Sequence, residues 1–251
     1  MSRFFTNFPK VDYAFGDEFN KKGGADLALE IFQDISAYVD LIDEIKNIGP
    51  YYSTYNILEN DRPDQVSYKL YGTTDYHWTF YLMNDGIRRQ GWPLSMAELD
   101  KKVKRDFPHK YIKTNTPLDG IFLPGQRAFG SVSSGSGEIL RRHLDLGLVI
   151  VDSKDHFQAN EKVSHTSYGG ITSSITCKST GHEYNAPRYY ENGDGEPVDI
   201  DPYNTSSGAL LNEVTQYDHY VRENDKLKQI KVIRPDTIQS IIGNYLQALK
   251  S

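Results

Sequence analysis

Two groups of polar residues in the sequence have types and spacings that could do chemistry. His143 and Asp145 lie two residues apart, so a strand would present both on one side, where they could bind a metal or exchange protons. A metal site would need a third ligand that the sequence does not supply, and we expect an ordinary surface pair. The second group could gather around a calcium ion, but its spacing is not that of an EF-hand and Pro197 interrupts it. It consists of Asp194, Glu196, Asp199 and Asp201, which we expect to be ordinary side chains of a hairpin.

The sequence lacks the motifs of the common catalytic sites. Its seven histidines are scattered, with no HExxH, no paired CxxC, no GxSxG and no phosphate-binding glycine loop between a strand and a helix. The single cysteine, Cys177, cannot form an internal disulfide and fits a chain made in a reducing cytoplasm. We expect it to be a buried or bystander thiol. The sequence therefore predicts no enzyme, no metal, no cofactor and no small-molecule substrate.

Composition excludes further classes of protein. The 251 residues can bury one good core or two small ones, and a formal net charge of -6 argues against a general nucleic-acid binder. The clearest basic cluster, at residues 101–105, is expected to be the solvated face of a helix. No charged-then-apolar leader opens the sequence, and no apolar run approaches the ~20 residues that span a bilayer. We expect neither secretion nor membrane insertion.

The elements that position these residues begin with a strand and two helices. Residues 51–58 are aromatic and β-branched with a period of two, which predicts a strand. Pro63 suits the first turn of a helix, and Gly72 can take the left-handed conformation that ends it. Thr73 and Thr74 can then cap a second helix that reaches residues 84–86. The predicted order is strand, helix, helix.

The end of the chain supplies a matching strand and helix. Residues 230–233 predict a strand, and Asp236 can cap a closing helix that is apolar on one face. If both halves pair, residues 51–86 and 229–249 form one discontinuous strand-helix-helix-strand domain of LysM-like order, and the chain between them is an insertion. Its predicted core contains Tyr71, Gly72, Trp78, Leu82, Ile230, Val232, Ile238 and Ile242.

The remaining segments mix helical and β patterns. Residues 24–48 predict one or two amphipathic helices, and Ser95 with Glu98 forms a capping box that opens a helix to about residue 105. Residues 114–182 look β-rich and include a predicted half-buried strand at 144–150. This segment also contains a weak internal sequence repeat, in which residues 122–128 align with residues 157–163. Two hairpin units in a small barrel would explain this. A further hairpin at 188–200 turns at Asn192 and Gly193, before a helix at 210–227.

The predicted fold class is therefore α+β, with helices at both ends of a LysM-like core and a β-rich insertion. The segments are an N-terminal arm and helix at 1–50, the first part of the core at 51–107, the insertion at 108–205, and a helix plus the closing part of the core at 206–251.

Tyrosine content points to contacts with other proteins. The chain has 18 tyrosines, and tyrosine combines a large apolar surface with a polar tip, as protein interfaces favour. Trp92 follows two arginines between predicted helices, a composition typical of interface anchors. Ordinary core and hairpin packing is the alternative for these aromatic residues. The predicted interface residues are Arg88, Arg89, Trp92, Tyr51, Tyr52, Tyr189, Tyr190 and Tyr203.

Several stretches together resemble one known family. They are residues 70–85 (LYGTTDYHWTFYLMND), the pair Gly91 and Trp92, and residues 223–233 (ENDKLKQIKVI), with a weaker likeness at residues 4–15 (FFTNFPKVDYAF). In this order they resemble the baseplate wedge protein 53 family of T-even-like contractile-tailed bacteriophages. The resemblance covers about half of the chain, at both ends. It departs from the family in the middle, where this chain carries extra β-rich sequence.

The resemblance implies a structural protein of the virion, located in the tail baseplate and assembled in the host cytoplasm. Its expected partners are other baseplate wedge proteins in six-fold repeated copies, and its expected role is to hold adjacent wedges together around the hub. A second class stays open, because LysM modules commonly bind peptidoglycan or chitin. A free LysM module is short and contiguous, however, whereas this one is split. A cell-wall hydrolase, the third class, lacks a catalytic constellation.

Overall fold

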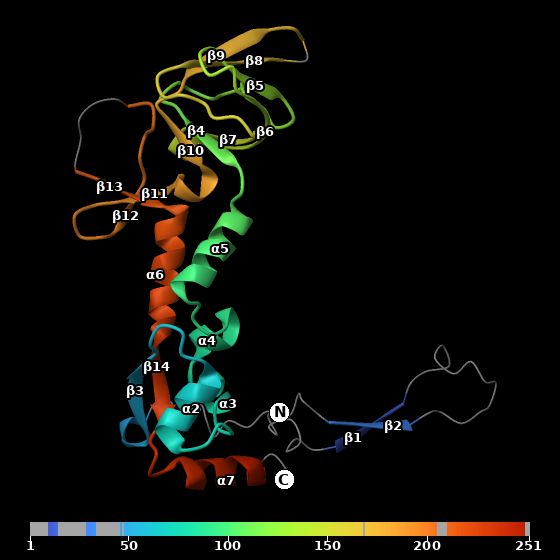
Figure 1. Cartoon of the computed structure of the whole chain (residues 1–251), viewed down its shortest axis with the longest axis vertical. Coiled ribbons are helices and arrows are strands. Elements are labelled where there is room, and N and C mark those ends of the chain that lie inside the picture. The colour runs from blue at the N-terminus through green and yellow to red at the C-terminus, as the bar shows by residue number, and fades with distance from the viewer. Residues whose placement is uncertain are drawn as a thin grey trace, which may run out of the picture. The chain divides into compact units, whose positions relative to one another are not determined.

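The computed structural model describes residues 10–14, 29–33, 46, 48–167, 169–204 and 210–248, and Figure 1 shows its helices and strands. The chain forms two compact units. The split unit combines Met1–Leu94 with Asp225–Ser251, and the inserted unit is Ser95–Asn224. Both units contain helices and strands, which confirms the predicted α+β class.

The split unit contains a two-stranded antiparallel sheet whose strands lie far apart in the sequence. These are β3 (Tyr52–Asn56) and β14 (Gln229–Ile233), and Thr54 lies opposite Lys231 (Figure 1). The predicted pairing of the two halves is thus confirmed. Because two strands alone are marginally stable, the sheet depends on the helices that pack against it.

Helix α2 (Pro63–Tyr71) follows its local signals. Pro63 occupies the first turn, and Gly72 ends the helix in the left-handed conformation with φ 71°, both as predicted. The hydroxyl of Tyr71 donates a hydrogen bond to the carbonyl oxygen of Ile233 at 2.8 Å. This bond ties the end of α2 to β14.

The next helices are shorter than the sequence predicts. α3 (Trp78–Met83) begins after His77, so the prediction that Thr73 and Thr74 cap it is wrong. The Thr73 hydroxyl instead accepts a hydrogen bond from the backbone N–H of Asp75 at 3.2 Å, within a turn. α4 (Asp85–Gln90) follows α3 and was not predicted.

The closing helix α7 (Ile238–Ala248) lies where the apolar periodicity predicts it. Its first residue is Ile238, so Thr237 and not the predicted Asp236 occupies the cap position. The Thr237 carbonyl accepts from the N–H of Ile241 at 3.0 Å, and the Thr237 hydroxyl donates to the Arg234 carbonyl at 3.2 Å.

Two clusters of apolar side chains form the core of the split unit. One gathers α3 and α7 residues around Ile233, and the other packs α2, α3 and α4 residues on the opposite side of β14. Trp78 contacts Tyr245, with ring centroids 5.5 Å apart. Gly72 lies outside both clusters and is exposed. The other predicted core residues lie in or against them: Tyr71, Trp78, Leu82, Ile230, Val232, Ile238 and Ile242.

The described N-terminal residues form a hairpin ladder. β1 (Lys10–Ala14) pairs antiparallel with β2 (Leu29–Gln33). The predicted amphipathic helix at residues 24–48 is therefore wrong over Leu29–Gln33. A run of five residues is too short for periodicity to separate strand from helix. Most of the rest of that prediction lies outside the described residues. The short 3-10 turn η3 (Gly49–Tyr51) leads into β3.

The inserted unit contains a seven-stranded antiparallel sheet of order β10-β4-β7-β6-β5-β8-β9. Its two outermost strands are consecutive in the chain and are separated only by Cys177 and Lys178. The N–H of Cys177 donates to the Glu161 carbonyl at 2.9 Å, and that of Lys178 donates to the Lys113 carbonyl at 2.7 Å. The ladder therefore closes through this bend into the small barrel that the sequence predicts. Its strands are β4 (Lys110–Lys113), β5 (Arg127–Gly130), β6 (Ser136–His143), β7 (Leu148–Asp152), β8 (Lys162–Thr166), β9 (Thr172–Thr176) and β10 (Ser179–His182).

The weak sequence repeat corresponds to a structural repeat. In the first copy Gln126 accepts a side-chain hydrogen bond from the N–H of Leu123 at 2.8 Å, and in the second Glu161 accepts from the N–H of Gln158 at 2.7 Å. β5 and β8, which follow these turns, pair with Ala128 opposite His165 and Gly130 opposite Val163. The two hairpins are thus related by an approximate two-fold axis at Phe129.

One predicted strand of the barrel is wrong in part. Leu144–Leu146 forms the 3-10 turn η4, and only Leu148–Asp152 is strand β7. β7 is buried on both faces, since Val149 and Val151 lie in the barrel core while Leu148 and Ile150 pack against Ala186 and Tyr111. Covering of the outer face explains why the expected half-buried pattern is absent.

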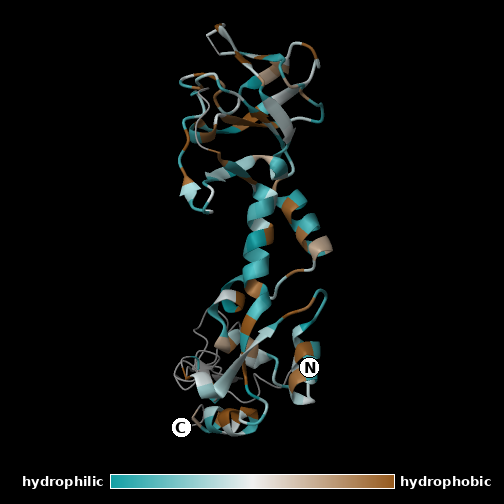
Figure 2. Ribbon diagram, turned by 90° about the vertical axis from the view of Figure 1, so that its left-hand side faces the viewer, coloured by the Kyte–Doolittle hydropathy of each residue, from teal (hydrophilic) through white to brown (hydrophobic). Residues whose placement is uncertain are grey.

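A three-stranded sheet and two helices complete the inserted unit. The hairpin of β11 (Pro187–Glu191) with β12 (Pro197–Val198) is confirmed, but its turn spans residues 192–196 with Gly195 at φ 81°, not Asn192 and Gly193 alone. β13 (Asn212–Thr215) joins β11, so α6 (Gln216–Lys228) begins later than predicted. Figure 2 shows α6 hydrophilic along most of its length. α5 (Met96–Asp106) has the predicted Ser95 capping box.

The register of the split sheet predicts a cross-link. Thr54 and Lys231 face each other, and Asn84 occupies the outward backbone groups of Lys231, so this is a non-hydrogen-bonded pair with closely spaced Cα atoms. We expect Thr54→Cys combined with Lys231→Cys to form a disulfide on mild oxidation, detected by a mobility shift on non-reducing gels. The matched control places cysteines at Thr54 and Gln229, two residues out of register. Equal cross-linking of both pairs would contradict the register.

Candidate protein interaction site

Some of the predicted interface residues lie on the surface of the split unit. Arg88 and Arg89 are exposed in the last turn of α4, where cations favour the helix C-terminus. Tyr51 is 40% exposed. Tyr52 is half-buried, with the ammonium of Lys231 4.7 Å from its ring centroid. Arg88, Arg89 and Tyr51 are therefore the accessible members of this predicted set.

Trp92 contributes to the core of the split unit. Its indole N–H donates a hydrogen bond to the Asp61 carbonyl at 2.7 Å. Its ring lies 6.0 Å from that of Phe80 and 6.2 Å from that of Tyr81, between centroids. These contacts are those of core packing, which was the alternative to an interface role for Trp92.

Tyr190 is buried in the inserted unit, with 8% of its surface exposed. Its hydroxyl donates to Glu213 at 2.8 Å, and burial followed by the Glu213 carboxylate raises its pKa. Tyr203 is half-buried and donates to the Leu144 carbonyl at 3.3 Å. Tyr190 is therefore buried in the inserted unit, and its role as an interface residue stays a prediction.

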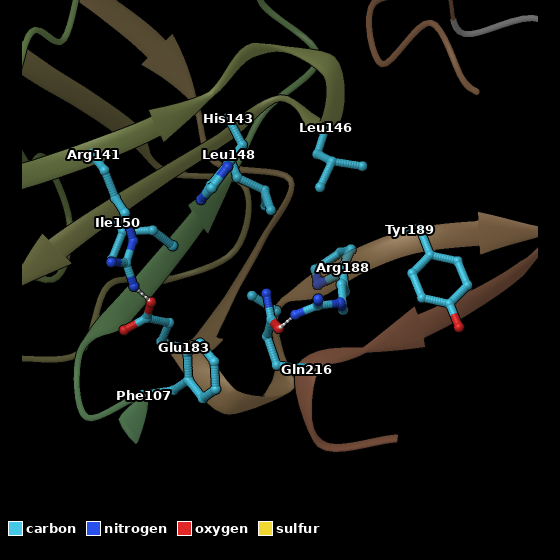
Figure 3. Close-up of a pocket in the computed structure, with 12 residues that line it drawn as sticks. Phe107, Arg141, His143, Leu146, Leu148, Ile150, Glu183, Arg188, Tyr189 and Gln216 are labelled. Atoms are coloured by element: carbon cyan, nitrogen blue, oxygen red, sulfur yellow. Dashed lines mark hydrogen bonds and ion pairs between the residues drawn. The ribbon is translucent and has the colours of Figure 1, made fainter. Parts of the chain in front are cut away.

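Tyr189 lines a pocket of about 430 Å³ in the inserted unit, which we call the Arg188 pocket (Figure 3). It lies between β7, β11 and the 3-10 turn η5 (Glu183–Asn185). Leu148 and Ile150 form its apolar side, together with Phe107 at the end of α5. Both β7 residues are almost fully buried, so the half-buried Phe107 and Leu146 present most of the accessible apolar surface.

The other side of the Arg188 pocket is charged. Arg141 forms an ion pair with Glu183, and Arg188 donates a hydrogen bond to the side-chain oxygen of Gln216 at 2.9 Å (Figure 3). Glu183 is 3% exposed, and its Oε2 atom has no hydrogen-bond donor among the described residues. Such a buried acceptor is unusual in folded proteins and marks a place where a donor is missing.

His143 and Asp145 do not share a strand, contrary to the prediction. His143 ends β6 and Asp145 lies in η4. Burial and then the nearby Arg141 lower the pKa of His143, so its imidazole is neutral at neutral pH. Both residues line a second pocket of about 570 Å³, which shares Arg188 and Tyr189 with the first and also contains Asp199.

The described residues contain no group of three or more histidine, cysteine or acidic side chains that could hold a metal ion. Cys177 is buried in the barrel, where burial and the Glu161 carboxylate raise its pKa to about 11. It is a protonated thiol at neutral pH and a poor nucleophile.

The residues of the Arg188 pocket were not singled out from the sequence. Arg141, Glu183 and Arg188 come from β6, η5 and β11, and only strand pairing brings them together. No short motif records such a juxtaposition, so the sequence contains no signal that would have identified them.

A buried histidine in the barrel predicts a pH dependence. His165 Nε2 accepts a hydrogen bond from the N–H of Phe122 at 3.2 Å, so its proton lies on Nδ1, which has no partner among the described residues. Burial lowers the pKa of His165 below its usual 6.5. The unfolded chain therefore binds more protons, and stability is complete above about pH 6.5 and lost as the pH falls toward the folded-state pKa.

We expect denaturant unfolding of the inserted unit to show this loss as the pH falls below about 6.5, the pKa of a histidine in the unfolded chain. His165→Gln keeps an acceptor for the Phe122 N–H but cannot be protonated, so its stability should vary less with pH. The exposed His156→Gln is the control and should keep the wild-type slope. An unchanged slope in His165→Gln would show that other groups cause the dependence.

The comparisons with known proteins concern the first part of the chain. Residues 3–95 match the family model described as base plate wedge protein 53. No curated protein matches the chain. The match ends next to Leu94, the boundary between the first segment of the split unit and the inserted unit. It includes residues 70–85 and the pair Gly91 and Trp92, whereas residues 223–233 lie outside it.

Residues 3–95 are therefore similar to a class of structural proteins of the phage tail baseplate. The matching family is base plate wedge protein 53, which confirms the resemblance predicted from the sequence. The family implies location in the virion baseplate and interaction with other baseplate proteins. No helix in the described part of the chain combines the length and apolar character needed to cross a membrane.

Proposed function

We propose that this protein is a structural component of the baseplate wedge that binds other wedge subunits and helps hold adjacent wedges together around the hub. The observation that carries the proposal is the family match over residues 3–95, which covers the first segment of the split unit. The protein would assemble in the host cytoplasm and remain in the virion. It acts by burying surface and needs no catalytic residue.

Repeated copies of the protein can stabilise the assembly even when each single interface is weak. Each contact must exceed the cost of losing translational freedom and ordering side chains, so one small interface binds weakly. Six-fold repeated copies in a ring make later contacts effectively intramolecular, and avidity then stabilises the assembly. Exposed Arg88, Arg89 and Tyr51 offer one contact surface on the split unit.

The test is size-exclusion chromatography with light scattering on the full chain, alone and mixed with purified wedge proteins of the same phage. We expect a monomer alone and a larger complex of defined mass in the mixture. Arg88→Glu should weaken co-elution, whereas Lys101→Glu, an exposed charge on α5, should not. A wild-type chain that stays monomeric in every mixture would contradict the wedge role.

A glycan titration separates the alternative class. Saturable binding of chitooligosaccharides or muropeptides, combined with no co-elution, would favour a glycan-binding module. Absence of binding together with co-elution would support the structural role.

A further inference from the structure

The Arg188 pocket combines features that suit a peptide from another protein. Its accessible apolar surface, formed by the half-buried Leu146 and Phe107, can take an aliphatic or aromatic side chain. Its volume of about 430 Å³ suits side chains rather than a whole domain. Its opposite side holds two guanidinium groups and one buried carboxylate. An occupant therefore needs both an apolar and a polar part.

Charge defines the polar part of the occupant. Arg141 is neutralised by Glu183, whereas Arg188 has no carboxylate partner among the described residues and bonds only the amide of Gln216. One cation is thus left uncompensated, and it matches one carboxylate of a ligand. Asp145 and Asp199 line the adjoining pocket and repel further negative charge, which disfavours a polyanion such as a nucleic acid.

Glu183 indicates that the occupant also has a backbone. Its Oε2 atom is buried without a donor among the described residues, although buried carboxylate oxygens normally accept hydrogen bonds. A peptide N–H is a donor of the required kind. A free phosphate lacks an apolar part and would be repelled by the same carboxylate.

We propose that the Arg188 pocket binds an extended segment of another protein that carries one acidic residue next to an apolar residue. The acidic side chain pairs with Arg188, the apolar side chain packs on Leu146 and Phe107, and a backbone N–H donates to Glu183. This segment belongs to a neighbouring subunit of the assembly, and that part of the inference rests on the proposed function.

The pocket can be tested without knowing the partner. A display library of random seven-residue peptides is selected on the full chain, and binding of enriched peptides is measured by fluorescence anisotropy. We expect enrichment of peptides with Asp or Glu beside Leu, Ile, Val or Phe. Arg188→Glu should weaken their binding roughly tenfold or more, while the exposed Arg127→Glu on β5 should leave it unchanged.

Three results would overturn the proposal: no enrichment, equal binding to Arg188→Glu with its fold verified by thermal melting, or full displacement of the peptides by inorganic phosphate. Co-elution with wedge proteins is measured on the same variant. Loss of peptide binding with co-elution intact would overturn the assignment of the segment to a neighbouring subunit and leave the wedge role standing. Peptide binding without any wild-type co-elution would instead overturn the wedge role and support the pocket.

Discussion

Replacing Glu161 by alanine is expected to lower the free energy of unfolding of the inserted unit by about 3–5 kcal/mol. The Glu161 carboxylate is 3% exposed and accepts hydrogen bonds from the N–H groups of Val132 at 3.0 Å, Ser133 at 2.9 Å and Gln158 at 2.7 Å. It therefore joins the β5–β6 turn to the turn before β8. Alanine would leave these part-buried donors without their protein acceptor.

Denaturant unfolding of Glu161→Ala measures the effect, with the exposed Glu138→Ala on β6 as a control that should change stability by less than about 0.5 kcal/mol. Burial opposes ionisation of Glu161, but the backbone N–H groups prevail and lower its pKa. Its contribution is therefore present above the unfolded-state pKa and lost as the pH falls through the folded-state pKa. Glu161→Ala should not show this acid loss, and a variant as stable as Glu138→Ala would contradict the bridging role.

Replacing Asn84 by alanine is expected to destabilise the split unit by about 2–4 kcal/mol. The Asn84 side chain accepts from the N–H of Lys231 at 2.8 Å and donates to the Lys231 carbonyl at 2.7 Å, so it pairs with the edge of β14 as a neighbouring strand would. It also donates to the Phe80 carbonyl at 2.8 Å at the end of α3. One amide thus joins two segments of the split unit.

Thermal and denaturant melts of Asn84→Ala check this expectation. Asn84→Asp retains the acceptor but turns a carboxylate oxygen toward the Lys231 and Phe80 carbonyl oxygens, so it should not recover the stability lost in alanine. Asn56→Ala, at an exposed position of β3, is the matched control. If Asn84→Ala melts like Asn56→Ala, the edge of β14 does not depend on the side chain.

Elements with strong local signals were predictable from the sequence. Pro63 and Gly72 bound α2, Ser95 opens α5, and the apolar periodicity of α7 survives in the fold. Each signal acts within a few residues, so no tertiary information is needed. The predicted cap of α7, Asp236, lies one residue before the observed cap position. The exact end of a helix is less well specified by the sequence than the helix itself.

The pairing of β3 with β14 was predictable although its strands lie far apart in the sequence, but other features that depend on distant neighbours were not. Gly147 ends η4 at φ 62°, and a Cβ atom there would lie 2.3 Å from the Thr114 carbonyl oxygen, a contact that the sequence does not reveal. The outer face of β7 is apolar because Ala186 and Tyr111 cover it. The Arg188 pocket is of the same kind, since its charged residues meet only through strand pairing. The fold class and the family resemblance could be inferred from the sequence, whereas this site required the structure.

The pairing of β3 with β14 has a consequence for the order of folding during synthesis. On the ribosome β3 emerges long before its partner, so the split unit cannot complete its sheet until residues 229–233 have been translated. The inserted unit can fold in the interval, and contacts of Tyr220 with Lys102 and Phe107 then bring α5 and α6 together. A folded insertion replaces a long flexible loop by a short span, which lowers the entropic cost of closing the sheet. Damage to the barrel should therefore slow maturation of the split unit even when the residues of that unit are unchanged.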